Sequence, residues 1–187
     1  MKIRESNMPR EEEWDRFFNP IETLKVLGLN SGIKDVADFG CGYGTFTIPA
    51  AQVISGKIYA FDLEPEMIKT VAQKAKNLSL KNVKPILRDF ISEGSGLKGA
   101  SVEFVMLFNI LHLENPISLL QETYRILTPN GKVGIIHWNY DATTPRGPPI
   151  NIRPKPEQIR KWAESVGFIF ETQFDLKPYH YALLLRK

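Results

Sequence analysis

An aspartate and three glycines stand where one predicted strand ends and a helix begins, in the segment Asp38-Phe39-Gly40-Cys41-Gly42-Tyr43-Gly44. Glycine has no Cβ, so the backbone of such a turn can approach a bound molecule closely and can adopt positive φ angles. In an open α/β sheet, the turn after a strand lies at the carboxyl edge, where ligands bind. The segment therefore predicts a ligand-binding site.

The spacing of the glycines separates two classes of ligand. A dinucleotide-binding turn has the pattern G-x-G-x-x-G, and its third glycine would fall on Thr45. The pattern is instead G-x-G-x-G, with Asp38 two residues before the first glycine. A second carboxylate, Asp62, closes the next predicted strand, where it can accept hydrogen bonds from both hydroxyl groups of a ribose. Each aspartate taken alone also suits a helix cap or a turn, but their order favours an adenosine-containing ligand.

Short strands and helices alternate after residue 30, which predicts a parallel sheet with helices on both faces. The last two strands are joined only by residues 175–179, too few for a parallel crossover, so one C-terminal strand is expected to be antiparallel. Pro49 falls well inside one expected helix, where it would cost a hydrogen bond. The expected strands are 35–39, 57–61, 83–87, 102–108, 132–138, 168–174 and 180–185, and the expected helices are 45–54, 64–77, one opened by Asn115-Pro116 and one from Pro156 to Gly167.

The length and composition are those of one globular domain covering residues 1–187, in which residues 1–30 form an N-terminal helical cap segment. No apolar run approaches the roughly 18 residues that cross a bilayer, and the charged first fifteen residues do not resemble a secretory signal. The net charge of +3 includes no concentrated basic run, which argues against nucleic acid as a partner. With one cysteine there is no disulfide and no cysteine-rich metal site, so we expect a cytoplasmic protein without a metal.

Five segments in chain order resemble the motifs of class I S-adenosylmethionine-dependent methyltransferases. They are VADFGCGYGTFT at 36–47, YAFDLEPEMI at 59–68, ILRDF at 86–90, FNILHLENP at 108–116 and LTPNGKVGII at 127–136. The resemblance runs from about residue 30 to residue 187 and is strongest to small-molecule methyltransferases of the UbiE-like kind. It implies a Rossmann-like three-layer α/β sandwich with a seven-stranded, mostly parallel sheet, and an enzyme whose cofactor is S-adenosyl-L-methionine.

The resemblance assigns one group of residues to the amino-acid end of the cofactor. Asp38 and the backbone of Gly40 would hold this end, and Gly42 and Gly44 would make room for it. Asn109, at the end of the fourth strand, would place its backbone carbonyl near the cofactor amino group, or would serve only as a turn residue.

A second group is assigned to the adenosine end. Asp62 would bind the ribose diol, and Leu63 would pack on the adenine. Asp89 would accept a hydrogen bond from the adenine N6 amine, and Phe90 would flank the ring.

Residues that would meet the methyl acceptor are harder to assign. His112 follows the fourth strand and is a candidate general base, because imidazole titrates near neutrality, although it could equally pack in its loop. Arg146 and Arg153 lie in a proline-rich loop at 141–155, where they could hold an anionic group or be solvated. The candidates for contact with the acceptor, besides Arg146, are Trp14, Phe18, His137 and Trp138. These four side chains could also simply pack on the sheet or finish a strand.

The sequence favours a small-molecule acceptor. Asn109 is followed by Ile110-Leu111-His112 rather than by a proline-rich NPPY-type run, which argues against methylation of the amino groups of flipped bases. Two alternatives stay open: a methyltransferase acting on protein or RNA, and a module that binds S-adenosylmethionine without turnover. Thr45 disfavours an NAD-dependent oxidoreductase.

Overall fold

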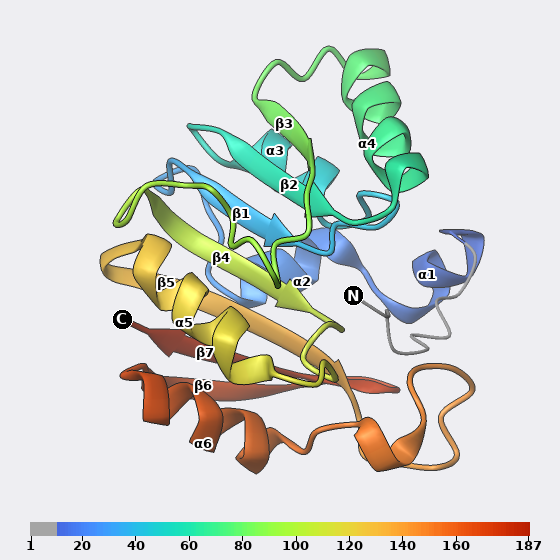
Figure 1. Cartoon of the computed structure of the whole chain (residues 1–187). Coiled ribbons are helices and arrows are strands. Elements are labelled where there is room, and N and C mark those ends of the chain that lie inside the picture. The colour runs from blue at the N-terminus through green and yellow to red at the C-terminus, as the bar shows by residue number, and fades with distance from the viewer. Residues whose placement is uncertain (1–10) are drawn as a thin grey trace.

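A computed structural model describes residues 11–187, apart from the side chains of residues 14–16. Its centre is a seven-stranded sheet with the strand order β3-β2-β1-β4-β5-β7-β6 (Figure 1). The five strands from β3 to β5 are parallel, and β7 runs antiparallel to both β5 and β6, which confirms the predicted antiparallel C-terminal strand. The strands are β1 (Val36–Phe39), β2 (Ile58–Asp62), β3 (Val83–Leu87), β4 (Val102–Phe108), β5 (Leu127–Trp138), β6 (Ile169–Leu176) and β7 (His180–Arg186).

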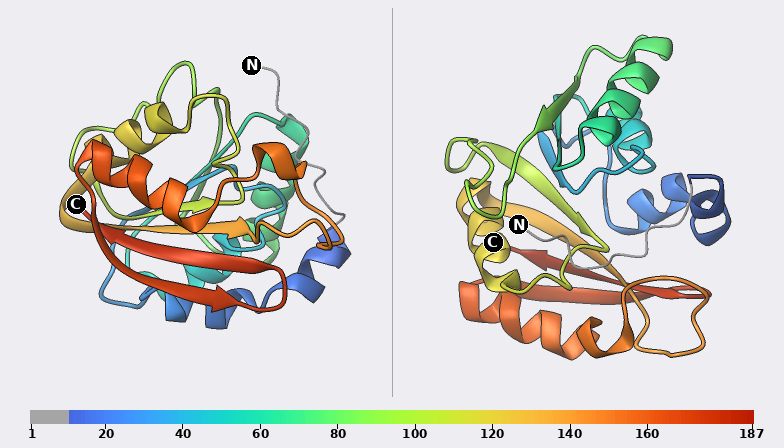
Figure 2. Two further views of the ribbon diagram at one scale, coloured as in Figure 1. Left: turned by 90° about the horizontal axis from the view of Figure 1, so that it is seen from below. Right: turned by 45° about the vertical axis from the view of Figure 1, so that its right-hand side comes forward.

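Helices cover both faces of the sheet and complete three layers (Figure 2). One apolar core lies between the sheet and α2, α3 and α4, and includes Leu24, Ala50 and Val71. The other lies between the sheet and α5 and α6, and includes Leu120 and Ile159. The helices are α1 (Glu11–Phe17), α2 (Pro20–Val26), α3 (Thr47–Val53), α4 (Pro65–Asn77), α5 (Pro116–Ile126) and α6 (Pro156–Val166), with a 3₁₀ turn, η1, at Ile150–Ile152.

Local sequence signals explain where several helices begin and end. Asn19 and Asn115 cap α2 and α5, because each side-chain oxygen accepts a hydrogen bond from the backbone N–H three residues later, at 3.3 Å in both cases. A proline follows each cap, where its fixed φ suits the first turn. Gly167 ends α6 with a φ of 113°, a left-handed conformation that favours glycine.

Two details differ from the sequence-based expectation. Helix α3 begins at Thr47, so Pro49 lies in the first turn, where a backbone N–H has no helical partner in any case, and the expected cost does not arise. Residues 128–131 do not separate α5 from a later strand, because β5 already begins at Leu127. They loop out between Leu127, which pairs with Val102, and Lys132, which pairs with Phe104.

None of the helices within residues 11–187 is both long enough and apolar enough to cross a membrane. Strands β1 and β4 end on the side of the molecule where α1 lies (Figure 1). The predicted site residues of the parallel strands therefore meet at one carboxyl edge.

Candidate cofactor and acceptor site

The glycine turn after β1 has a backbone that other residues could not easily adopt. Gly40, Gly42 and Gly44 have φ angles of 75°, 51° and 80°. The N–H groups of Gly40 and Cys41 donate to the carbonyl oxygen of Phe61 at 2.8 and 2.9 Å, which fixes the turn to the end of β2. A Cβ at Gly40 would come within 2.8 Å of Ile110 Cδ1, so the turn after β4 also presses against this loop.

Asp38 lies beneath the turn and is only 3% exposed. Thr47 Oγ1 donates a hydrogen bond to Asp38 Oδ2 at 2.5 Å. Burial raises the pKa of Asp38 to about 7, the charge of Asp62 adds to the rise, and the Thr47 hydrogen bond opposes it. A cationic group bound next to Asp38 would favour its ionised form, which suits the ammonium group of an amino acid.

Asp62 connects the end of β2 to the same turn. Its Oδ2 accepts a hydrogen bond from the backbone N–H of Gly42 at 2.9 Å, and its Oδ1 accepts one from Glu64 at 3.0 Å. Each carboxylate oxygen can accept a second hydrogen bond, so both remain available to a diol. The carboxylate is therefore held in one orientation before a ligand binds.

Asn109 ends β4 with a φ of 55°, which asparagine tolerates better than most residues. Its backbone N–H donates to Ile136 at 2.7 Å, and its side-chain Oδ1 is buried without a hydrogen-bond partner among the described residues. A buried oxygen without a donor costs free energy unless a ligand or solvent supplies one. The glycine turn, the two aspartates and this oxygen together fit an adenosine-linked amino acid.

The three remaining residues assigned to the adenine have different environments. Leu63 is partly exposed directly after β2, whereas Phe90 is 3% exposed and packs on Phe39 with 5.1 Å between ring centroids. Asp89 Oδ1 accepts hydrogen bonds from the backbone N–H groups of Ile91 and Ser92, both at 3.2 Å. Burial opposes ionisation of Asp89, but hydrogen bonds from Ser92 and Ile91 lower its pKa overall.

On the acceptor side, the structure brings Phe18 and Trp138 together through a third residue. His180, the first residue of β7, pairs with Trp138 across the sheet, and their ring centroids are 4.0 Å apart. Phe18, at the α1–α2 junction, lies 4.2 Å from the same imidazole. His180 is fully buried, and neither ring nitrogen has a hydrogen-bond partner among the described residues.

His180 was not singled out from the sequence. The predicted antiparallel pairing of the last two strands places His180 only opposite the end of β6, and its pairing with Trp138 of β5 was not predicted. Burial lowers the pKa of His180 to about 3, and the charge of Arg153 lowers it further, so the imidazole is neutral at physiological pH.

His137 points to the other face of the sheet, because neighbouring residues of a strand alternate. Its ring centroid is 5.6 Å from that of His112, and both side chains are buried. Burial is the main cause of the lowered pKa of His137, and the neighbouring His112 adds to it. The candidate base and this strand-end histidine are therefore neighbours, on the face opposite to Phe18 and Trp138.

The two loop arginines have different roles. Arg146 forms an ion pair with Glu13 of α1 at 3.2 Å, which joins the loop to the N-terminal segment. Arg153 is 6% exposed and donates to the carbonyl oxygens of Asn139, Asp141, Arg146 and Pro148 and to the hydroxyl of Thr144. These contacts use all of its N–H donors, so Arg153 organises the loop and has no donor left for a substrate.

The N-terminal segment is also joined to the opposite side of the carboxyl edge. Glu11 of α1 forms an ion pair with Lys74 of α4, and Lys74 also donates to the carbonyl oxygen of Tyr43 at 2.8 Å. Helix α1 is therefore tied both to α4 and to the proline-rich loop. The side chain of Trp14, another acceptor candidate, lies outside the described residues.

Comparison with known proteins agrees with this geometry. Residues 36–131 match the methyltransferase domain family. The crystal structure of a SAM-dependent methyltransferase from Aquifex aeolicus has a TM-score of 0.83 to this chain at 25% sequence identity, over 96% of this chain and 94% of that one. The chain thus belongs to the S-adenosylmethionine-dependent methyltransferase family, and its cofactor is S-adenosylmethionine.

Two curated relatives act on different kinds of acceptor, as their names state. A demethylmenaquinone methyltransferase of Geobacillus sp. (strain WCH70) is 29% identical over 115 residues, which are 60% of this chain and 48% of that protein. A ribosomal protein L11 methyltransferase of Streptococcus pneumoniae (strain P1031) is 27% identical over 162 residues, 82% of this chain and 44% of that protein. The chain spans about half the length of these curated relatives.

Proposed function

We propose that this protein transfers the methyl group of S-adenosylmethionine to a small-molecule acceptor. The observation that carries the proposal is the pair of buried carboxylates, Asp38 and Asp62, held on either side of the glycine turn by Thr47 and by the N–H of Gly42. Asp38 is placed to pair with an ammonium group and Asp62 to accept from a ribose diol. No step of this assignment needs a metal or a second cofactor.

The bound cofactor supplies an electrophilic methyl group on a sulfonium. The chain positions the cofactor and the acceptor and excludes water from the site. Asp38, the backbone of Gly40, and Asn109 hold the amino-acid end, with Gly42 and Gly44 making room. Asp62 holds the ribose. Leu63, Asp89 and Phe90 are assigned to the adenine.

The acceptor is expected beside the end of β5. Phe18 and Trp138, with the neutral His180 between them, form a mostly apolar and aromatic cluster there, and all three side chains are buried. An acceptor bound next to this cluster would be planar or apolar rather than highly charged. His112 lies beside His137 on the opposite face of the sheet, so it is a candidate base only for an acceptor that reaches that face.

The N-terminal residues 1–30 act in this proposal as a cap on a single domain of residues 1–187. Its described part, α1, α2 and the junction between them, supplies Phe18 and the ion pair from Glu13 to Arg146, and Trp14 belongs to the same segment. We place the enzyme in the cytoplasm, where both cofactor and small-molecule acceptors are available.

Thermal unfolding tests the cofactor site. S-adenosylmethionine or S-adenosylhomocysteine at 100 times its dissociation constant should stabilise the protein by about 2.7 kcal/mol, which is a shift of roughly 5–10 °C for a chain of this size. NAD should give no shift, and Asp62→Ala should lose the effect. Asp175→Ala, an exposed carboxylate on β6, is the matched control and should keep it. If neither S-adenosyl compound shifts the midpoint of the wild type, the proposal is wrong.

A protein acceptor is the second candidate, because the similarity to the ribosomal protein L11 methyltransferase extends over 82% of this chain. Incubation of the enzyme with methyl-labelled S-adenosylmethionine and a cell extract separates the candidates. Label in the small-molecule fraction supports the proposal, whereas label in the protein or RNA fraction overturns the small-molecule acceptor. Binding of the cofactor with no product in any fraction would indicate a non-catalytic module.

A further inference from the structure

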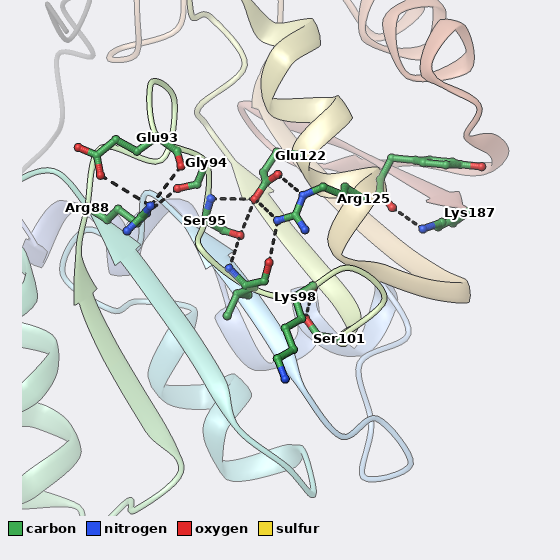
Figure 3. A network of polar contacts seen from close by, with 11 residues as sticks. Arg88, Glu93, Gly94, Ser95, Lys98, Ser101, Glu122, Arg125 and Lys187 are labelled. Atoms are coloured by element: carbon green, nitrogen blue, oxygen red, sulfur yellow. Dashed lines mark hydrogen bonds and ion pairs between the residues drawn. The ribbon is translucent and has the colours of Figure 1, made fainter.

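The loop that follows β3 is anchored by a carboxylate from a distant helix. Glu122 of α5 accepts two hydrogen bonds through its Oε1 from Ser95, one from the backbone N–H at 2.8 Å and one from Oγ at 2.5 Å (Figure 3). Ser95 Oγ in turn accepts a hydrogen bond from the N–H of Leu97 at 3.0 Å. The middle of the loop is thus fixed to α5.

Arg125 holds the carboxylate itself, one helical turn further along α5. Its Nε and Nη2 donate to the two oxygens of Glu122 at 2.7 and 2.8 Å, and Nη2 also donates to the carbonyl oxygen of Leu97 at 2.8 Å. These hydrogen bonds from Arg125 are the main cause that lowers the pKa of Glu122 to about 2. Glu122 therefore remains ionised and in one orientation.

Arg88 closes the other side of the loop. Its Nε donates to the carbonyl oxygen of Gly94 at 2.6 Å, and its Nη2 donates to that of Glu93 at 3.1 Å. The N–H of Glu93 donates to the carbonyl oxygen of Asp89 at 2.9 Å. The backbone of Asp89 is thus joined to Glu93. Figure 3 shows how Arg88 and Glu122 hold the residues that follow, Glu93, Gly94 and Ser95.

Two glycines let the backbone come this close to the charged groups. Gly94 and Gly96 have φ angles of 64° and 74°. A Cβ at Gly94 would lie 3.3 Å from Glu122 Oε1, and one at Gly96 would lie 3.3 Å from the Arg88 guanidinium carbon. The short sequence Glu93-Gly94-Ser95-Gly96 is therefore shaped around Glu122 and Arg88.

We propose that Glu122 is a positioning residue for recognition of the adenine amine, acting through this loop on Asp89. The inference rests on the proposed function, in which Asp89 accepts a hydrogen bond from N6. Asp89 lies two residues beyond the end of β3, so the sheet alone does not fix its carboxylate. Glu122 holds this loop at Ser95, six residues after Asp89, and so limits the movement of the segment between them. A hydrogen bond to N6 requires placement within a few tenths of an ångström.

Two ligands that differ at position 6 of the purine, and in the proton that the neighbouring N1 carries in the second one, measure the effect. S-adenosylhomocysteine carries the amine, whereas S-inosylhomocysteine carries an oxygen at the same position. The wild type should bind the first about ten times more tightly, and Glu122→Ala should reduce this ratio to about two or three. Glu122→Gln should keep much of the ratio, because its amide oxygen can still accept from Ser95. Ser95→Ala, a milder change that keeps the backbone contact, should lower the ratio in the same direction.

Glu164→Ala is the control, because it removes a carboxylate that pairs with Arg160 on α6 and touches no loop residue. A purely structural role for Glu122 would lower the unfolding midpoint and leave the ratio at its wild-type value, and that result would overturn the proposal. Asp89→Ala tests the second assumption, that Asp89 binds N6. If this variant still binds S-adenosylhomocysteine and keeps the wild-type ratio, Asp89 does not recognise N6. The positioning role of Glu122 is then wrong, whereas the proposed cofactor site is unaffected. A wild type that binds neither ligand would overturn the proposed function as well.

Discussion

Thr47 and Asp38 form a hydrogen bond of 2.5 Å across the glycine turn, with the hydroxyl of the first residue of α3 as donor and the buried carboxylate of β1 as acceptor. The contact ties the strand to the helix on either side of the cofactor loop. It also opposes the effect of burial on the pKa of Asp38, which still rises to about 7. The charge of Asp38, and with it the proposed binding of an ammonium group, thus depends on a neighbouring hydroxyl.

Thr47→Val removes that hydroxyl and keeps the shape of the side chain. The pKa of Asp38 should rise further, so binding of S-adenosylhomocysteine at pH 7 should weaken by about tenfold. Calorimetric titration at pH 7 and pH 9 measures this, and the loss should shrink at pH 9, where Asp38 is ionised in both proteins. An equal loss at both pH values would contradict the mechanism. Thr70→Val, on the exposed side of α4, is the matched control.

Asp38→Asn should make the ligand-free protein more stable at high pH while abolishing cofactor binding. The folded-state pKa of Asp38, about 7, lies above its ordinary value of 3.8, so its contribution to stability is full below pH 4 and is lost as the pH rises to 7. Between these values the wild type should lose about 1.4 kcal/mol per pH unit relative to the variant. Urea unfolding from pH 4 to pH 8 tests this, and parallel curves for the two proteins would contradict it.

The places of the residues assigned to the cofactor were predictable because their signals are local. Asp38 and Asp62 end apolar strands, the glycines stand between a strand and a helix, and the carboxyl ends of parallel strands share one edge. The pairing of the last two strands followed from the short connection between them. These features depend only on neighbours in the sequence and on the period of apolar residues.

The acceptor side and the support of the site were not predictable, because they depend on pairings between distant residues. His180 meets Trp138 only through the register of β7 on β5. Arg153 binds backbone carbonyl oxygens, which leave no trace in the sequence, and it therefore resembled a free arginine. Glu122 and Ser95 are 27 residues apart, and a single helical glutamate is usually a solvated one.

Arg153→Lys should loosen the proline-rich loop, since a lysine ammonium cannot span the set of carbonyl oxygens that the guanidinium joins. We expect a loss of about 3 kcal/mol in the free energy of unfolding and faster cleavage by trypsin at Arg146, which lies in the same loop. Arg160→Lys on α6 is the control and should leave both quantities near their wild-type values. If trypsin cleaves the Arg153→Lys protein no faster than the wild type, the loop does not depend on this side chain.

His180→Phe should remove part of the acid sensitivity of the fold. The folded-state pKa of His180, about 3, lies below its ordinary value of 6.5, mainly because of burial, so its contribution to stability is full above pH 6.5 and is lost as the pH falls toward 3. Between pH 7.5 and pH 5 the free energy of unfolding of the wild type should therefore fall by about 2 kcal/mol more than that of the variant. Tyr179→Phe is the matched control, because Tyr179 contacts the same aromatic group through Phe17 and the substitution keeps an aromatic ring there. Urea unfolding at the two pH values measures the difference, and an equal loss in His180→Phe and wild type would mean that His180 is not held neutral between Phe18 and Trp138.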